Sequence, residues 1–267
     1  MKFVTVVNNF EIFDKVFRQN SLIEKYEQYV FDNTVENVGI SERYNSFINQ
    51  NIDQNSDFWI IFCHQDFGFF EDPFNNINSL DKNYIYGAVG VGFKYKQKKI
   101  IRFLDKKFYT TKKGIHLFGE IHQGNNDFEF FKHGERLSSP YPVETVDCCC
   151  IIVHSSLISR YNLRFDENLK FHMYSEDFSI TARKKHNIET KVVQLECYHL
   201  GKGTIDEIFY DSLEYVKNKH GINRLICTTI PHHKEIGTKR VKKFLFKVFS
   251  IKCMNKLFRP IASILEE

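Results

Sequence analysis

The chain has 267 residues, of which 42% are hydrophobic and 15% are aromatic, and its formal net charge is +4. This composition is too apolar and too weakly charged for a disordered protein, and its 13 Gly and 5 Pro exclude collagen-like and low-complexity classes. The length predicts one large domain or two small ones, and either could bury a full hydrophobic core.

The charge is unevenly distributed along the chain. Residues 234–259 contain nine Lys or Arg and one acid, a local charge of +8, which leaves −4 for the rest. A nucleic-acid-binding protein would be expected to carry a basic surface on its body as well. We therefore expect no nucleic-acid partner.

Cysteine usage and hydropathy bear on the compartment. The seven cysteines are an odd number, and Cys148, Cys149 and Cys150 are consecutive. Neighbouring residues on a strand point to opposite faces, so a disulfide framework is excluded and reduced thiols in a cytosolic protein are expected. The apolar run at residues 3–7 is too short for a signal-peptide core, and no stretch of about 18 uncharged apolar residues predicts a membrane span.

The first 66 residues alternate between strand and helix patterns. Strands are predicted at residues 3–7, 28–31 and 58–63, and helices at residues 11–26 and 41–48, the second with Ser41 as a possible N-cap. This alternation predicts a parallel sheet with crossover helices. Such sheets bind ligands at the carboxyl ends of their strands, where Asn8, Asp32 and Asp66 are expected.

The second half has a different character. A strand-like segment at residues 84–92 is followed by polar, weakly periodic residues 94–140, which we interpret as a variable insertion or loop region. Further on, the pattern predicts strands at residues 146–153 and 191–195 and helices at residues 155–161 and 175–186.

Taken from the residues alone, each polar motif has two interpretations. The strand end His64-Gln65-Asp66 could hold a divalent cation, or it could be a polar loop after a buried strand. His199 could be a second ligand or a structural histidine. Glu176 and Asp177 could supply a general base, or they could simply favour the positive end of a helix dipole.

The order of these motifs along the chain resembles that of the family-2 glycosyltransferases with the GT-A fold. Residues 58–66 are similar to the strand that leads into the family's Asp-X-Asp motif, and residues 146–158 to its acceptor-side strand and helix. Residues 165–167 and 174–179 resemble the segment that carries the catalytic base. The His-Gln-Asp form is similar to a bacterial branch linked to capsule and surface-polysaccharide synthesis, and the resemblance covers about residues 3–204.

The resemblance implies a fold and a domain organisation. We expect an α/β, GT-A-like, mostly parallel sheet flanked by helices over residues 1–233. Residues 1–92 would form the nucleotide-sugar-binding half and residues 93–233 the acceptor and catalytic half. Residues 234–267 would form a separate basic, amphipathic helical tail.

The resemblance also implies an activity, the inverting transfer of a sugar from a nucleotide-sugar donor to a hydroxyl of an acceptor. The donor would above all be a UDP-sugar, and the acceptor a growing surface glycan such as capsule or lipopolysaccharide. Asp177 would be the base, and Glu176 would position the acceptor or support Asp177. The donor would be bound by Asn8, Asp32, Asn45, His64 and Asp66.

A divalent metal, Mn²⁺ or Mg²⁺, would be bound by Asp66 and His199. His64 stands where the more usual motif has its first Asp, and an imidazole shifts the preference toward Mn²⁺. Two other functions remain open: a non-catalytic nucleotide-sugar-binding or glycan-binding subunit, and a metal-dependent hydrolase that uses the same His and Asp side chains.

The C-terminal tail has its own pattern. Apolar residues recur at three-, four- and seven-residue steps from Val241 to Leu265, beside a stripe of Lys. Such helices lie in the headgroup plane of anionic membranes, so we expect peripheral association with the inner face of the plasma membrane, close to a lipid-linked acceptor. The alternative is that the tail packs on the body or on another copy of the chain.

Overall fold

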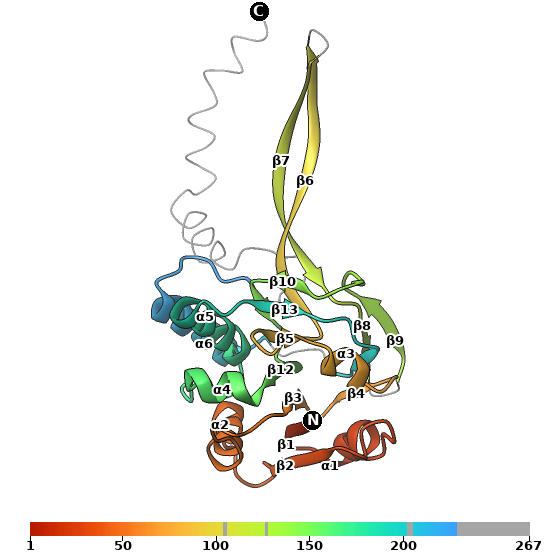
Figure 1. The fold of residues 1–267 in the computed structure, drawn as a ribbon, viewed down its shortest axis with the longest axis vertical. Helices are drawn as coiled ribbons and strands as arrows, with labels where there is room; N and C mark the ends of the chain where they lie inside the picture. Colours follow the sequence, from red (N-terminus) through yellow and green to blue (C-terminus); the bar gives the residue numbers. More distant parts are fainter. Residues whose placement is uncertain (104–105, 126–127, 202–204, 229–267) are drawn as a thin grey trace, which may run out of the picture.

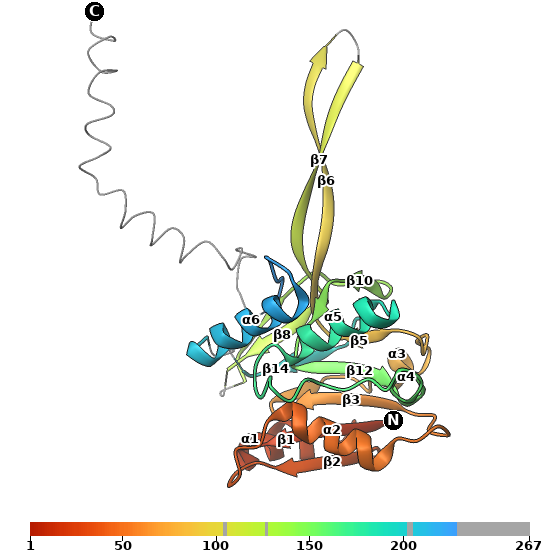
Figure 2. The same ribbon diagram turned by 90° about the vertical axis from the view of Figure 1, so that its left-hand side faces the viewer.

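The structure is a computed structural model that describes residues 1–103, 106–125, 128–201 and 205–228, with the backbone alone for residues 95–113. A seven-stranded sheet forms its centre, and helices cover both faces (Figures 1 and 2). The predicted tail at residues 234–267 lies outside the described residues. Among the helices that are described, none is both long enough and apolar enough to cross a bilayer.

The central sheet has the strand order β10-β13-β5-β12-β3-β1-β2. Five strands run in one direction, while β12 and β10 are antiparallel to their neighbours. The prediction of an α/β protein with a mostly parallel sheet is therefore confirmed. The strands are β1 Lys2–Val7, β2 Glu27–Asp32, β3 Trp59–His64, β5 Ile85–Gly87, β10 Tyr141–Val143, β12 Cys150–His154 and β13 Thr190–Val192.

Alternation along β3 explains why the sheet has a core on each face. Ile60 and Phe62 pack with α2 (Ile40–Asn51), α4 (Ser155–Tyr161), α5 (Tyr174–His186) and α6 (Glu207–His220). Trp59 and Ile61 pack into the opposite core with α1 (Phe10–Phe13), η1 (Asp14–Arg18) and α3 (Phe74–Asn78). The continuous apolar run predicted burial on both faces, and all five residues of Trp59–Cys63 are at most 5% exposed.

Residues 94–140 contain strands instead of the expected loop region. β6 (Gly90–Phe103) and β7 (Lys106–Phe118) form a long antiparallel hairpin, and β11 (Thr145–Val146) pairs with the base of β6. A four-stranded sheet follows, with the order β4 (Phe67–Phe69), β14 (Cys197–His199), β8 (Ile121–Gly124) and β9 (Phe130–His133). A two-stranded ribbon needs no continuous apolar face, so it leaves little periodic signal in the sequence.

Two helix starts and one helix length differ from the sequence-based expectation. The helix expected at residues 11–26 ends with the π-helical turn η1, after which the Asn20 side chain donates to Phe69 O and accepts from Leu22 N. Gly39, not Ser41, is the N-cap of α2, because the Ser41 hydroxyl donates to Leu169 O at 2.6 Å. Met173, in a left-handed conformation with φ 62°, precedes α5.

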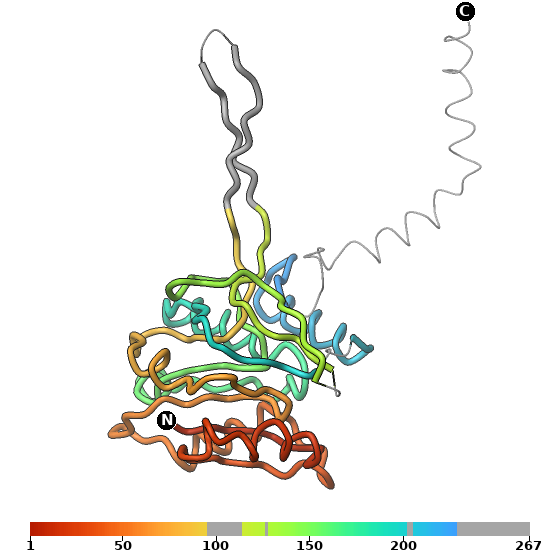
Figure 3. The backbone as a smooth tube through the Cα atoms, turned by 90° about the vertical axis from the view of Figure 1, so that its right-hand side faces the viewer, coloured from red at the N-terminus to blue at the C-terminus, as the bar shows by residue number. Residues whose placement is uncertain are grey.

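The two halves of the chain share one sheet. Strand β12, from the second half, pairs with β3, from the first half (Figure 3). None of the six cysteines that the structure describes forms a disulfide, and burial raises the pKa of the Cys63 thiol to about 12. Burial likewise raises the pKa of Cys148, Cys149, Cys150 and Cys197, so these thiols are neutral.

Candidate functional site

Three predicted site residues follow adjacent parallel strands, so they lie at one edge of the sheet. The strand register pairs Val7 with Asp32 and Val6 with His64, and Asn8 is the next residue after β1. The Gln65 side chain connects these strand ends. Its Oε1 accepts from the backbone N–H groups of Asn8 and Asn9, both at 2.9 Å, and its Nε2 donates to Asn8 Oδ1 at 2.6 Å.

Asp32 is exposed at this edge. Its Oδ1 accepts hydrogen bonds from the hydroxyl and the backbone N–H of Thr34, at 2.7 and 2.8 Å, and these bonds lower the pKa of Asp32. The side chain therefore presents a fixed negative charge at the end of β2. Such a carboxylate can accept hydrogen bonds from a polar ligand.

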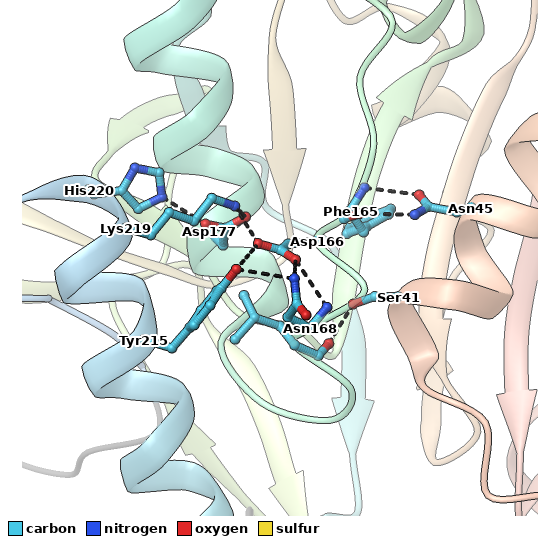
Figure 4. Close-up of polar contacts among 10 residues, drawn as sticks. Ser41, Asn45, Phe165, Asp166, Asn168, Asp177, Tyr215, Lys219 and His220 are labelled. Atoms are coloured by element: carbon cyan, nitrogen blue, oxygen red, sulfur yellow. Dashed lines mark hydrogen bonds and ion pairs between the residues drawn. The ribbon is translucent and has the colours of Figure 1, made fainter.

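Asn45 lies elsewhere and has a structural role. Its Oδ1 accepts from Phe165 N at 3.0 Å, and its Nδ2 donates to Phe165 O and Glu167 Oε1, both at 2.9 Å (Figure 4). With 4% exposure and both ends of its amide engaged, Asn45 ties α2 to the segment before α5. We therefore leave Asn45 out of the nucleotide-binding set.

His64, Asp66 and His199 come together in space. One donor atom from each lies within 4.8 Å of the others, and Oδ1 of Asp66 lies 3.3 Å from Nε2 of His199 and 4.0 Å from Nδ1 of His64. The pairing of β14 with β4 places His199 and Asp66 opposite each other, and Leu200 N donates to Asp66 O at 3.0 Å. The sequence predicted Asp66 and His199 as a pair, and the structure adds His64.

This donor set fits a divalent cation. Nε2 of His199 is buried, and its 3.3 Å contact with Asp66 Oδ1 lacks the geometry of a hydrogen bond. Burial by itself would raise the pKa of Asp66, but His199 and then His64 outweigh it and lower the pKa to about 2, so the carboxylate is charged. Burial lowers the pKa of His64, which favours a neutral imidazole with a free lone pair.

A hydroxyl lies against the ring nitrogen of His64 that is farther from Asp66. The Tyr174 hydroxyl lies 2.8 Å from His64 Nε2 and donates to Cys148 O at 3.4 Å. In the tautomer with its proton on Nε2, His64 donates to the Tyr174 oxygen, and Nδ1, the nitrogen nearer Asp66, has a lone pair for a cation. Metal-binding histidines commonly donate their second ring N–H in this manner.

Gly201 leaves room for Asp66 and His199 to lie side by side. A Cβ at this position would lie 2.7 Å from Asp66 Oδ2 and 3.0 Å from Nε2 of His199. The side chain of Gln123 donates to His199 O and to Gly201 O, so β8 holds this segment in place. Any larger residue at position 201 would displace Asp66.

Asp147 is a further acid at this site, and the sequence analysis did not predict it as a site residue. The carboxylate accepts from Cys149 N at 2.8 Å and from the Thr228 hydroxyl. Burial by itself would raise the pKa of Asp147, but the charge of His199 and these hydrogen bonds lower it. The backbone carbonyl of Cys149, two residues later, accepts from His64 N at 3.1 Å. This contact places the turn at Asp147 beside the metal-binding candidates.

Glu176 and Asp177, at the start of α5, have different surroundings. Glu176 is 3% exposed, and its Oε2 accepts from the Ser175 hydroxyl at 2.9 Å. Burial, reinforced by the charge of Asp147, raises the pKa of Glu176 to about 7. This carboxyl group can therefore exchange a proton near neutral pH.

Asp177 belongs to an ion-pair network with α6. Its Oδ1 accepts from His220 Nε2 at 2.7 Å, and its Oδ2 accepts from Lys219 Nζ at 2.8 Å (Figure 4). Lys219 also donates to Asp166 Oδ2 at 2.6 Å, and Asp166 in turn accepts from Tyr215 and Asn168. The network joins the start of α5 to the last turns of α6.

A cavity of about 730 Å³ lies elsewhere on the protein. Its lining includes Tyr84, Arg136, Lys191 and Gln194, but none of the predicted site residues. Because the cavity lacks the cluster of His and Asp side chains, the candidate site is defined by the strand ends and the start of α5.

Comparison with known proteins gives structural similarities only. No family model matches the chain, and no curated protein matches it. Similar solved structures include residues 1–349 of TarS from S. aureus (11% identity, TM-score 0.43, covering 82% of this chain), A197 from STIV (13%, 0.36, 88%) and HddC from Yersinia pseudotuberculosis (11%, 0.31, 82%). The chain spans 65% of the TarS structure, 92% of A197 and 78% of HddC.

Proposed function

We propose that the protein transfers a sugar from a nucleotide-sugar donor to a hydroxyl of an acceptor glycan, with inversion at the anomeric carbon. The observation that carries this proposal is the cluster of His64, Asp66 and His199 at the carboxyl edge of the parallel strands. Beside it, Tyr174 connects His64 to the helix that begins with the acidic pair. The resemblance of the motif order to GT-A glycosyltransferases supports the same activity.

The divalent metal would be held by His64, Asp66 and His199. When bound, it supplies positive charge that stabilises the departing nucleotide diphosphate. Two imidazoles and one carboxylate suit Mn²⁺ better than Mg²⁺, because Mg²⁺ prefers oxygen ligands.

The remaining residues act directly on the substrates. Asn8 and Asp32 bind the nucleoside, for which uridine is the first choice, and Gln65 holds Asn8 in position. The acceptor hydroxyl loses its proton to a carboxylate in the first turn of α5. Residues 1–92 serve the donor, and residues 93–233 serve the acceptor and the chemistry.

The acceptor that we propose is a lipid-linked glycan of a bacterial surface polysaccharide, such as capsule or lipopolysaccharide. The basic tail at residues 234–267 would hold the enzyme at the inner face of the plasma membrane, where such an acceptor is found. Its apolar and basic pattern supports this location.

The test incubates the protein with Mn²⁺ and a panel of UDP-, GDP-, dTDP- and CMP-sugars, with and without a glycan acceptor. The measured product is the released nucleotide diphosphate, or CMP for the CMP-sugars. Release that requires the acceptor is expected. Release that does not increase with any acceptor would identify a hydrolase, and donor binding without release would identify a binding subunit.

Two variants locate the activity at the candidate site. His199→Ala should abolish Mn²⁺ binding and release, whereas His133→Ala, an exposed histidine in the neighbouring sheet, should affect neither. Equal loss in both variants would contradict the assignment of the metal site.

A further inference from the structure

We propose that Glu176 accepts the proton of the acceptor hydroxyl and that Asp177 is a structural ion-pair residue. This assignment rests on the proposed function. It gives different roles to Glu176 and Asp177, which are adjacent in the sequence. It reverses the roles that the family resemblance suggests for the two residues.

The contacts of Asp177 make it a poor base. Both of its carboxylate oxygens accept from cationic or ring N–H donors, Lys219 and His220, at 2.8 and 2.7 Å. The residue is 1% exposed, so these partners are held in place by the surrounding structure. An acceptor hydroxyl would therefore have to displace Lys219 or His220 before it could donate to either oxygen of Asp177.

Glu176 has the opposite environment. Among the described side chains, the Ser175 hydroxyl donates to it, and no Lys, Arg or His forms an ion pair with it. Burial and the charge of Asp147 both disfavour its ionised form, and the resulting pKa of about 7 suits a general base at neutral pH. Unlike the oxygens of Asp177, the carboxylate of Glu176 is not held by a Lys or His side chain, so it can accept from a substrate hydroxyl.

Glu176 also belongs to the same electrostatic neighbourhood as the metal-binding candidates. The charge of Asp147 disfavours the ionised form of Glu176, helps to raise the pKa of His199, and opposes in part the lowering of the His64 pKa by burial. The first turn of α5 lies beside the cluster, because the hydroxyl of Tyr174, two residues before Glu176, lies 2.8 Å from His64 Nε2. Pairs of carboxyl groups whose pKa values are pushed apart commonly mark acid and base roles, here an ionised Asp147 and a titrating Glu176.

The step balances without a further reactant. The acceptor oxygen passes its proton to the Glu176 carboxylate as its electron pair forms the bond to the anomeric carbon of the donor. The bond from that carbon to the diphosphate oxygen breaks, and its electron pair leaves with the nucleotide diphosphate. Glu176 then returns the proton to solvent.

The test compares two nucleophiles. A hydroxyl acceptor needs a base, whereas azide arrives already deprotonated. Glu176→Gln should lower transfer to the hydroxyl by about 10²–10⁴-fold while transfer to azide stays within a few-fold of wild type, because an amide cannot take up the proton. Glu207→Gln, an exposed acid in the first turn of α6, is the matched control and should change neither rate by more than about two-fold.

A second variant covers the case in which Glu176→Gln does not fold. Glu176→Ala should lose hydroxyl transfer and regain part of it with added formate, a small carboxylate that can occupy the vacated space. Asp177→Asn should lower the melting temperature, and in its folded fraction it should keep hydroxyl transfer within about ten-fold.

The assignment is overturned if Glu176→Gln retains the wild-type rate with the hydroxyl acceptor. It is also overturned if folded Asp177→Asn loses hydroxyl transfer but keeps azide transfer, because that result would give the base role to Asp177. Failure of the proposed function looks different: the wild-type protein would then release no nucleotide diphosphate from any donor.

Discussion

Replacing Glu176 with Gln should change how stability depends on pH. The ordinary pKa of this carboxyl group is 4.5, and in the folded protein it is about 7. Between these values the folded protein keeps a proton that the unfolded chain has released, so the free energy of unfolding falls as pH rises. At about 1.4 kcal/mol per pKa unit, the wild type loses about 3 kcal/mol through this window, and the Gln variant loses none of it.

The same group gives activity the opposite dependence on pH. Transfer requires the ionised carboxylate, so kcat/KM should rise with pH and level off above about 7. The groups that face Glu176 are Asp147, Asp177, Ser175 and Cys148. Because burial raises the pKa of the Cys148 thiol, that residue stays neutral throughout, while Asp147 stays charged.

The assay is urea unfolding from pH 5 to pH 8 for the wild type and Glu176→Gln. The free energy of unfolding of the variant, relative to wild type, should increase by about 2–3 kcal/mol across this range. All other titrating groups are common to both proteins and cancel in the difference. Parallel curves would refute the reasoning, because Glu176 would then take up no proton on folding.

Three further predictions follow from other contacts. Asp177→Asn should destabilise the protein by about 3 kcal/mol in urea unfolding, because it breaks a buried ion pair and leaves its partners uncompensated. Gly201→Ala should weaken Mn²⁺ binding at least about ten-fold by calorimetry, since its Cβ would lie 2.7 Å from Asp66 Oδ2. Gly114→Ala, whose Cβ would come no closer than 3.8 Å to another residue, should bind Mn²⁺ normally. Deleting residues 238–267 should abolish sedimentation with anionic liposomes and spare transfer to a soluble acceptor, and retained sedimentation would contradict the membrane role of the tail.

The sequence predicted the central sheet well because burial on both faces of a strand leaves an unmistakable pattern. The apolar run of Trp59–His64 and the strand–helix alternation before it require a covered, parallel arrangement. The first helix was predicted too long, because its end depends on Asn20, whose side chain donates to Phe69, a residue 49 positions later. The periodicity of nearby residues does not reveal a contact between residues so far apart in the sequence.

The site was predictable where parallel topology alone decides it. Asn8, Asp32 and Asp66 were expected at the carboxyl ends of parallel strands, and the structure has Asn8 and Asp32 there, with Asp66 two residues beyond the end of β3. Asp147 was missed because it precedes its strand, β12. That strand is antiparallel to β3, so its amino end lies at the edge where the parallel strands have their carboxyl ends. Asp147 is an acid next to an apolar run in the sequence, but its place at this edge follows only when the direction of β12 is known.

The division between Glu176 and Asp177 required the tertiary structure for a related reason. Neighbouring residues on a helix point about 100° apart, so two adjacent acids face different surroundings even though their sequence context is identical. The partners that distinguish them, Lys219 and His220, lie more than 40 positions later, in the last turn of α6. There the local pattern favours cations near a helix C-terminus whether or not an acid lies opposite. Helix dipoles alone explain both the acids in the first turn of α5 and the cations in the last turn of α6. The packing of α6 against α5 makes Asp177 an ion-pair partner and leaves Glu176 able to accept a proton.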